Sequence, residues 1–255
     1  MKYSFIVMDP PTRDTFATLQ DCGYDGIELN MREPFDLDAV ERNLEDHNLV
    51  MPSFLTGEAY FDGLCLSSQR AEVRRQTVER LIRYVDIAHR FKSIMVVGLL
   101  QGLRRDEPDP AIAATRIRDG LRAVADVAES KGVEFVIEPV NHLQVGFHNS
   151  VAEVRNLIAE VGFPAIRPMV DTIHMNIEES SLTQPILDCG AALRHIHLCE
   201  SNGGRFGSGH IPFAEVLATL RTIHYHHFAS VKVYRHLAFA EAAKSSIDYL
   251  RAIEN

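Results

Sequence analysis

Short β-rich runs alternate with longer amphipathic runs along the whole chain, and this alternation constrains the fold more than any other feature of the sequence. Strands that alternate with helical patterns indicate a parallel sheet. A last helical run, Leu237–Ile253, follows the final strand. The predicted strands are Tyr3–Met8, Gly26–Asn30, Leu49–Leu55, Ser93–Gly98, Glu134–Pro139, Ile166–Asp171, Leu193–Cys199 and Phe228–Tyr234.

Eight such units in a chain of 255 residues favour a closed barrel, since a (β/α)8 barrel typically takes about 250 residues. An open dinucleotide-binding sheet is disfavoured, because no G-x-G-x-x-G follows the first strand. No linker or low-complexity segment interrupts the pattern. We therefore expect an α/β fold with a single TIM-barrel domain over residues 1–255.

Charge and composition exclude several classes of partner. The net charge of −9 argues against a sequence-independent nucleic-acid binder, which needs a concentrated basic surface. The chain has no 18-residue apolar run, so we expect no membrane span. The N-terminus has only a short apolar patch that ends at Asp9, which predicts a first strand and not a signal peptide. The four cysteines form no CxxC pair, which is typical of a reduced, cytoplasmic protein.

Polar residues at the C-terminal ends of the predicted strands are the candidates for chemistry, because TIM-barrel active sites lie at that end. Glu138, Asp171 and His197 come from three consecutive strands, so their side chains can converge on one point. Two carboxylates and a neutral imidazole suit a divalent ion such as Mn, Mg, Co or Zn. Three protein ligands would leave positions open for substrate oxygens. The other candidates are Glu28, His174, Glu200 and Lys232.

Structural roles compete with functional ones at several of these positions. A single carboxylate at a strand end is more often a surface or capping residue than a ligand. Glu28 either lines the pocket or bonds to a neighbouring strand. His195 lies two residues before His197, and we expect it to point the other way, in a structural or supporting role. The run His224–His227 is predicted to be a solvated turn at the opposite, N-terminal end of the barrel.

Three stretches carry a resemblance to a known family: GYDGIEL at 23–29, VDTIHMNIEE at 170–179, and HIHLCESN with the later GSGHIPF at 195–213. The chain resembles the xylose-isomerase-like sugar isomerases and epimerases, especially ketose 3-epimerases of the tagatose and psicose epimerase type. The resemblance implies that Asp171 and His197 bind a metal and that His174, in the loop after the sixth strand, contacts the substrate. It implies that Glu138 binds the metal and also acts as a base. It further implies a homo-oligomer.

Three positions depart from that family. Its second catalytic glutamate, at the end of strand eight, falls on Lys232, and a glutamate after strand five falls on Gln144. Its substrate-binding arginine falls on Gly203, although Arg205 is close enough to substitute. The fold and the outline of the metal site therefore carry over better than the reaction does.

Lys232 admits four roles. It could serve as a second acid or base, since a desolvated lysine titrates nearer neutral pH. It could form a Schiff base with a carbonyl substrate, or bind a substrate carboxylate or phosphate as a fixed cation. Alternatively, its ammonium could pair with Glu138 or Asp171 and replace the charge of the metal, which would leave a weak or empty metal site.

The function we expect is that of a sugar, sugar-acid or sugar-phosphate isomerase or epimerase, which moves a proton next to a carbonyl with the help of a divalent metal. Glu138 removes the proton, and Lys232 returns it or anchors an anionic group. The alternatives are a decarboxylase or lyase that uses Lys232 on an oxo-sugar acid, and a non-catalytic sugar-binding relative with a degenerate metal site. A zinc-dependent DNA-repair endonuclease is disfavoured by the acidic charge. The expected substrate-binding residues are His174, Glu200, Arg205 and Glu28.

Overall fold

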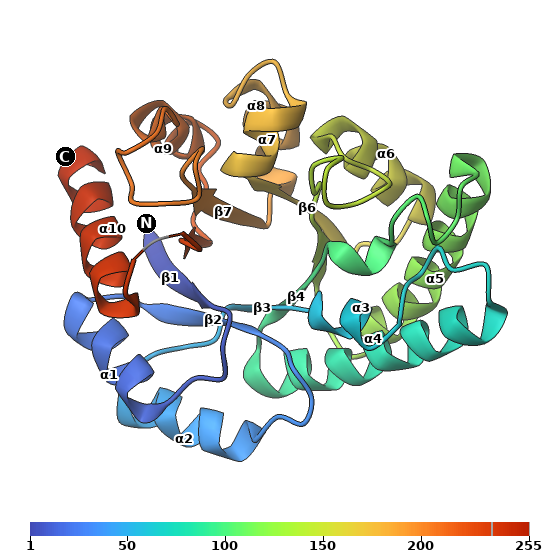
Figure 1. Ribbon diagram of the computed structural model, residues 1–255, viewed down its shortest axis with the longest axis horizontal. Helices are drawn as coiled ribbons and strands as arrows, with labels where there is room; N and C mark the ends of the chain where they lie inside the picture. Colours follow the sequence, from blue (N-terminus) through green and yellow to red (C-terminus); the bar gives the residue numbers. More distant parts are fainter. Residues whose placement is uncertain (236, 255) are drawn as a thin grey trace.

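Parallel strands close into one barrel in chain order, and the last strand pairs with the first (Figure 1). This computed structural model describes residues 1–235 and 237–254. It confirms the predicted single (β/α)8 barrel within those residues. The strands are β1 Lys2–Val7, β2 Gly26–Asn30, β3 Ser53–Leu55, β4 Ile94–Val97, β5 Phe135–Ile137, β6 Ile166–Asp171, β7 His195–Cys199 and β8 Phe228–Lys232.

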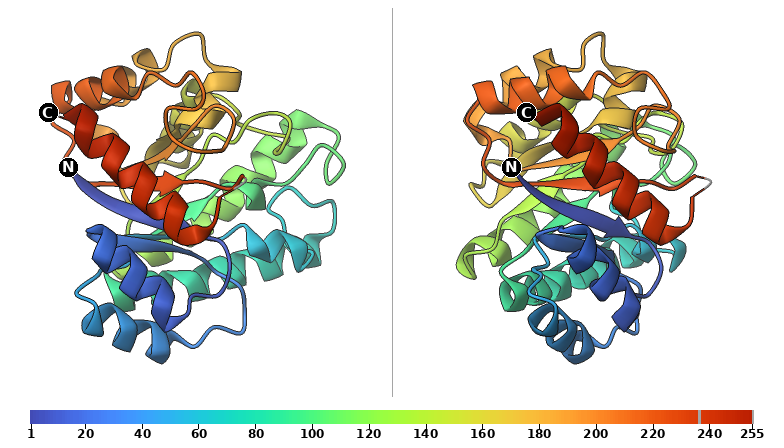
Figure 2. Two further views of the ribbon diagram at one scale, coloured as in Figure 1. Left: turned by 60° about the vertical axis from the view of Figure 1, so that its left-hand side comes forward. Right: turned by 90° about the vertical axis from the view of Figure 1, so that its left-hand side faces the viewer.

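Helices surround the barrel on its outside (Figure 1). Figure 2 shows both chain ends at the same end of the barrel, where the Met1 amino group lies 3.7 Å from Glu254 Oε1. None of the described helices is long and apolar enough to cross a membrane. The helices are α1 Arg13–Cys22, α2 Leu37–Asp46, α3 Glu58–Phe61, α4 Ala71–Phe91, α5 Pro110–Ser130, α6 Val151–Val161, α7 Thr172–Glu178, α8 Gln184–Cys189, α9 Phe213–Thr222 and α10 Phe239–Glu254, with 3-10 turns at Leu99–Gln101 and Gly190–Ala192.

Local signals in the sequence set the start of α6 and the end of α1. Ser150 caps α6 by accepting from the backbone N–H of Glu153, whose carboxylate accepts from Ser150 in return. This reciprocal pair satisfies two backbone donors that a helix start leaves free. Gly23 ends α1 with a positive φ of 82°, a conformation that costs glycine little. These two helix ends are therefore set by capping residues.

Four strands differ from the expectation by two or more residues at one end, and one predicted loop is helical. β5 ends at Ile137 and not at Pro139, and β7 begins at His195 and not at Leu193. β3 begins at Ser53 and not at Leu49, because Pro52 has no N–H to donate to the ladder. β8 ends at Lys232, two residues earlier than predicted. The segment after Asp171, predicted to be a loop, is the helix α7. Asp171 itself starts this helix, since its Oδ1 accepts from the backbone N–H of Ile173 at 2.9 Å.

The barrel interior is divided into an apolar side and a polar side. Ile94, Val96, Val136 and Met169 form a small buried cluster inside β4, β5 and β6. On the other side, buried polar groups from β1, β2, β3, β7 and β8 meet one another. A much larger apolar core fills the layer between barrel and helices. The stability of the fold thus resides in the outer layer, which leaves one side of the interior available for polar chemistry.

Candidate active site

Glu138, Asp171 and His197 meet at the C-terminal end of the barrel, as the order of their strands predicted. One ligand atom from each lies within 4.8 Å of the other two. His197 Nδ1 is 3.1 Å from Glu138 Oε1 and 3.4 Å from Asp171 Oδ2. The pairing of β6 with β7 sets Asp171 directly beside His197. We call these three residues the carboxylate–imidazole cup.

Lys232, at the end of β8, points into this cup. Its Nζ donates to Asp171 Oδ2 at 2.8 Å and lies 4.0 Å from Glu138 Oε1. Burial alone would lower the pKa of Lys232, but the two carboxylate charges outweigh burial and raise it. Burial raises the pKa of Asp171, yet the nearby cations, Lys232 foremost, hold it well below its usual value. The pair is therefore an ammonium and a carboxylate at neutral pH.

This ion pair separates the four roles predicted for Lys232 into those that need a neutral amine and those that need a charged ammonium. A Schiff base or a proton shuttle near neutral pH needs a neutral amine, and hence a lowered pKa. The pKa of Lys232 is instead raised, mainly by Asp171 against the opposing effect of burial. The geometry favours the two remaining roles, in which the lysine acts as a fixed cation.

His174 reaches the cup from the first turns of α7. Asn141 Nδ2 donates to His174 Nδ1 at 2.7 Å, which leaves the Nε2–H facing Glu138 and Asp171 at 3.7 and 3.8 Å. Burial lowers the pKa of His174 and outweighs the carboxylates. A neutral imidazole with its N–H directed at the pocket can donate to a substrate oxygen. The sequence interpretation did not include Asn141, although it lies three residues after Glu138 in EPVN.

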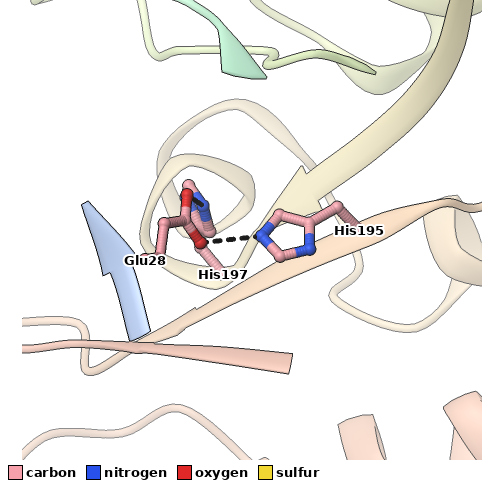
Figure 3. Close-up of side chains that lie close together, drawn as sticks. All are labelled: Glu28, His195 and His197. Carbon is pink, nitrogen blue, oxygen red and sulfur yellow. Dashed lines mark hydrogen bonds and ion pairs between the residues drawn. The ribbon is translucent and has the colours of Figure 1, made fainter. Parts of the chain in front are cut away.

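Glu28 lies one layer deeper, on β2, and touches the back of His197 (Figure 3). Its Oε1 is 3.0 Å from His197 Nε2, and its Oε2 is 2.9 Å from His195 Nε2. The hydroxyls of Ser53 and Ser230 also donate to Oε2. The carboxylate is fully buried, and Glu28 is not among the residues that line the cavity above the cup. The expected substrate contact is thus corrected: Glu28 orients the histidines.

The predicted direction of the His195 side chain was wrong, although its contact with Glu28 is compatible with the predicted structural or supporting role. Side chains alternate between the faces of a strand, so residues two apart share one face. His195 and His197 accordingly both point into the barrel, with ring centroids 5.1 Å apart. The run His224–His227 does lie before β8, at the N-terminal end, where His224 and His226 are exposed.

Glu200 and Arg205 belong to the loop between β7 and α9. Both oxygens of Glu200 are occupied by backbone N–H groups of this loop, from Ser201, Gly207 and Ile211. Arg205 is exposed, and neither residue is among those that line the cavity above the cup. The carboxylate of Glu200 therefore holds its own loop together, and the predicted contact of Glu200 and Arg205 with a substrate stays a prediction.

Position 203 is closed to an arginine for a steric reason. The backbone of Gly203 has a φ of 70°, and a Cβ built on it would lie 2.5 Å from the ring of Tyr234. The backbone N–H groups of Tyr234 and Arg235 both donate to the Gly203 carbonyl. The loops after β7 and β8 are thus joined at this glycine.

A cavity of about 200 Å³ opens above the cup. Glu138, His174, His197 and Lys232 form its floor and one wall. Phe61 stands at the cavity and is 74% exposed. Sequence reasoning missed most of the lining, because it comes from strand ends, short helices and loops that only the closed barrel brings together. The remaining lining residues are Met8, Asn30, Leu55, Thr56, Gly57, Glu58, Val96, Gly98, Leu99, Val140 and Gln144.

The three ligand atoms of the cup fit a divalent ion by type and by separation. Metal–ligand bonds of about 2.0–2.2 Å place neighbouring ligand atoms about 3.0–3.5 Å apart. The distances of 3.1 and 3.4 Å from His197 Nδ1 agree with this range. Glu28 behind His197 completes the carboxylate–histidine arrangement that commonly supports a metal ligand.

Comparisons with known proteins agree on one family and one class of enzyme. The model of the xylose isomerase-like TIM barrel family matches residues 16–253. A D-psicose 3-epimerase of Agrobacterium fabrum is 36% identical over 212 residues, which cover 80% of this chain and 72% of the relative. A 3-dehydro-D-guloside 4-epimerase of Escherichia coli is 31% identical over 220 residues, with 83% of each protein covered.

Solved structures agree on the fold. A D-allulose 3-epimerase from Methylomonas sp., in complex with D-allulose, superposes with a TM-score of 0.86 at 22% identity, covering 99% of this chain and 96% of that one. The barrel, its site and the relatives define an enzyme of the isomerase and epimerase class. The chain belongs to the xylose isomerase-like TIM barrel family.

Proposed function

We propose that this enzyme isomerises or epimerises a small keto sugar or a related polyhydroxy carbonyl compound by moving a proton on the carbon next to the carbonyl. The observation that carries this proposal is the placement of Glu138. Its carboxylate lines the cavity, while His197 and Lys232 lie against the same Oε1. Burial raises the pKa of Glu138, but Lys232 and the two histidines outweigh it and lower the pKa. Glu138 is thus an ionised base at the cavity floor.

The groups around Glu138 suit the charge that develops when the proton leaves. Removal of a proton next to a carbonyl gives an enediolate, whose negative oxygens need donors or cations. His174 offers its Nε2–H, and, as long as no metal occupies the cup, Lys232 offers ammonium N–H groups beyond the one bound to Asp171. A divalent ion in the cup would supply a Lewis acid that polarises the substrate oxygens. Apolar side chains of the lining, such as Leu55 and Leu99, can cover the C–H faces of a sugar.

The proton's return distinguishes the two reactions. In an aldose–ketose isomerisation, Glu138 alone can deliver the proton to the neighbouring carbon on the same face of the enediolate, while a second proton passes from one enediolate oxygen to the other. An epimerisation needs a second proton donor on the opposite face of the carbon. Apart from His197, which lies 3.1 Å from Glu138 Oε1 and belongs to the cup, His174 and Lys232 lie near the same oxygen at 3.7 and 4.0 Å and also line the cavity. The raised pKa of Lys232, due to Asp171 in spite of burial, makes it a poor partner for that step.

Turnover on a defined set of sugars tests the proposal. The purified enzyme with added Mn²⁺ is incubated with five- and six-carbon ketoses, aldoses and keto-glycosides, and the products are separated and identified by NMR. We expect conversion within at least one carbonyl class and a loss of at least 10²-fold in Glu138→Gln, in keeping with the usual weight of a general base. Activity that survives in Glu138→Gln would contradict the assignment of the base.

Two further expectations, one from the resemblance and one from the cysteine pattern, remain predictions. We propose that the chain forms a homo-oligomer, which light scattering of the purified protein would measure. We also propose a cytoplasmic location, which fractionation of the source cells would test.

A further inference from the structure

Asp171 has one oxygen left for a cation. Its Oδ1 accepts from the backbone N–H of Ile173 and thereby starts α7. Its Oδ2 is the atom that faces His197 Nδ1 and that receives the Lys232 ammonium at 2.8 Å. A metal held by the cup would have to bond to this same oxygen. The ammonium and the metal therefore share an acceptor.

Electrostatic repulsion between the metal and the Lys232 ammonium adds to their competition for Asp171 Oδ2. A divalent ion bonded to Asp171 Oδ2 at about 2.1 Å would lie at most about 5 Å from the ammonium in its present position. Two cations at that distance in a buried site repel each other strongly. The Lys232 side chain is only 19% exposed and Asp171 is fully buried, so water screens the repulsion little. The lysine must move before a metal can bind well.

The space beside the cup shows what that movement would cost. A second cavity, of about 190 Å³, adjoins Lys232 and is lined by apolar side chains such as Ile6 and Val233. Gln144 also lines it, but no carboxylate is among its described lining residues. An ammonium that moves there exchanges its ion pair with Asp171 for uncharged acceptors, such as the Gln144 amide oxygen or the Tyr234 hydroxyl. Metal binding is thus opposed both by repulsion and by the loss of this pair.

We propose that Lys232 is a built-in cation that competes with divalent metal for Asp171 and Glu138 and so sets the metal affinity of this enzyme. In the metal-free state its ammonium holds the two carboxylates together; a metal ion enters by displacing it into the adjoining cavity. The inference rests on the proposed function, because it takes the cup as the metal site. It predicts that this chain binds divalent ions weakly and that the side chain at position 232 sets the affinity.

Calorimetric titration of Mn²⁺ into the metal-stripped full chain tests the competition. Lys232→Met removes the charge and should bind Mn²⁺ at least tenfold more tightly than the wild type. Lys232→Glu adds a fourth ligand, a carboxylate oxygen, and should bind more tightly again. Lys244→Met changes the net charge equally but lies on α10, where Lys244 pairs with Asp248 on the surface. This control should match the wild type.

Equal or weaker Mn²⁺ binding by Lys232→Met, or no binding by any of the proteins, would overturn the inference. If that variant does not fold, Lys232→Gln offers an uncharged donor to Asp171 and carries the same expectation. The wild type gives a readout without mutation: Mn²⁺ should increase acetylation of Lys232 by a lysine-reactive reagent, measured by mass spectrometry, and unchanged labelling would count against displacement. Sugar turnover is not part of this comparison, so its outcome bears on the proposed function alone.

Discussion

Glu28 and His197 meet inside the barrel, where Glu28 Oε1 accepts from His197 Nε2 at 3.0 Å. The other ring nitrogen, Nδ1, faces Glu138 and Asp171. A carboxylate behind a histidine fixes which ring nitrogen carries the proton and which is free to bind a metal. Glu28 therefore decides the orientation of His197 without touching the cavity.

Replacement of Glu28 by glutamine tests this relationship. The glutamine amide keeps the shape of the side chain, but its NH₂ group can donate to His197 Nε2. Nε2 then accepts instead of donating, and the ring proton moves to Nδ1, the nitrogen that faces the cup. We expect Glu28→Gln to weaken Mn²⁺ binding about 10–100-fold, the usual effect of losing such a support. His195→Gln is the matched control, because His195 bonds to the other oxygen of the same carboxylate and not to the cup. Equal losses in both variants would show a general packing defect.

Gly98 gives the Glu138 carboxylate its room. A Cβ at position 98 would lie 2.6 Å from Glu138 Oε2, closer than atoms tolerate. Gly98→Ala should therefore displace the base and lower kcat/KM at least tenfold, since small misplacements of reacting groups are costly. Gly57 lines the same cavity, but there a Cβ would meet Leu99 at an ordinary 3.5 Å. Gly57→Ala should keep most of the activity. Steady-state measurement of kcat/KM for both variants tests this difference.

The buried carboxylate of Glu200 stabilises the loop after β7 through three backbone N–H groups. Burial would raise its pKa, but the N–H donors of Ser201, Ile211 and Gly207 lower it overall. Hydrogen bonds to a charged group contribute about 1.5–3 kcal/mol. We expect Glu200→Ala to lower the free energy of unfolding by about 2 kcal/mol at pH 7.

This contribution should depend on pH in a defined direction. Because the pKa of Glu200 is lower in the folded state, its stabilisation is present above the unfolded pKa of about 4.3 and fades as the pH falls through the folded value. Urea unfolding at pH 7 and below pH 4 should thus show a deficit that shrinks in acid. A deficit that is constant with pH would mean that Glu200 acts through packing alone.

The barrel and its ligand set could be predicted because each depends on local sequence. Strand periodicity and capping residues such as Ser150 and Gly23 act within a few residues, and strand order alone brings Glu138, Asp171 and His197 together. The short helix α7 was missed because Asp171 serves both as a strand end and as a helix cap.

Other features depend on contacts between distant segments. Glu28 and His197 are bonded across the barrel, and no spacing in the sequence reveals that the carboxylate lies behind the ring. The misplacement of His195 was an error of strand geometry, since residues two apart share a face. Glu200 looked like a pocket residue because it directly follows β7, but the loop folds back over its carboxylate.

The central claim is that Glu138 removes a proton from the carbon next to the substrate carbonyl. The most direct measurement is the incubation of a converted sugar in D₂O, with deuterium at each carbon followed by NMR. The account predicts deuterium at the carbon next to the carbonyl with the wild type, and at least 10²-fold slower incorporation with Glu138→Gln. Conversion without any deuterium at that carbon, or incorporation at the wild-type rate in Glu138→Gln, would contradict it.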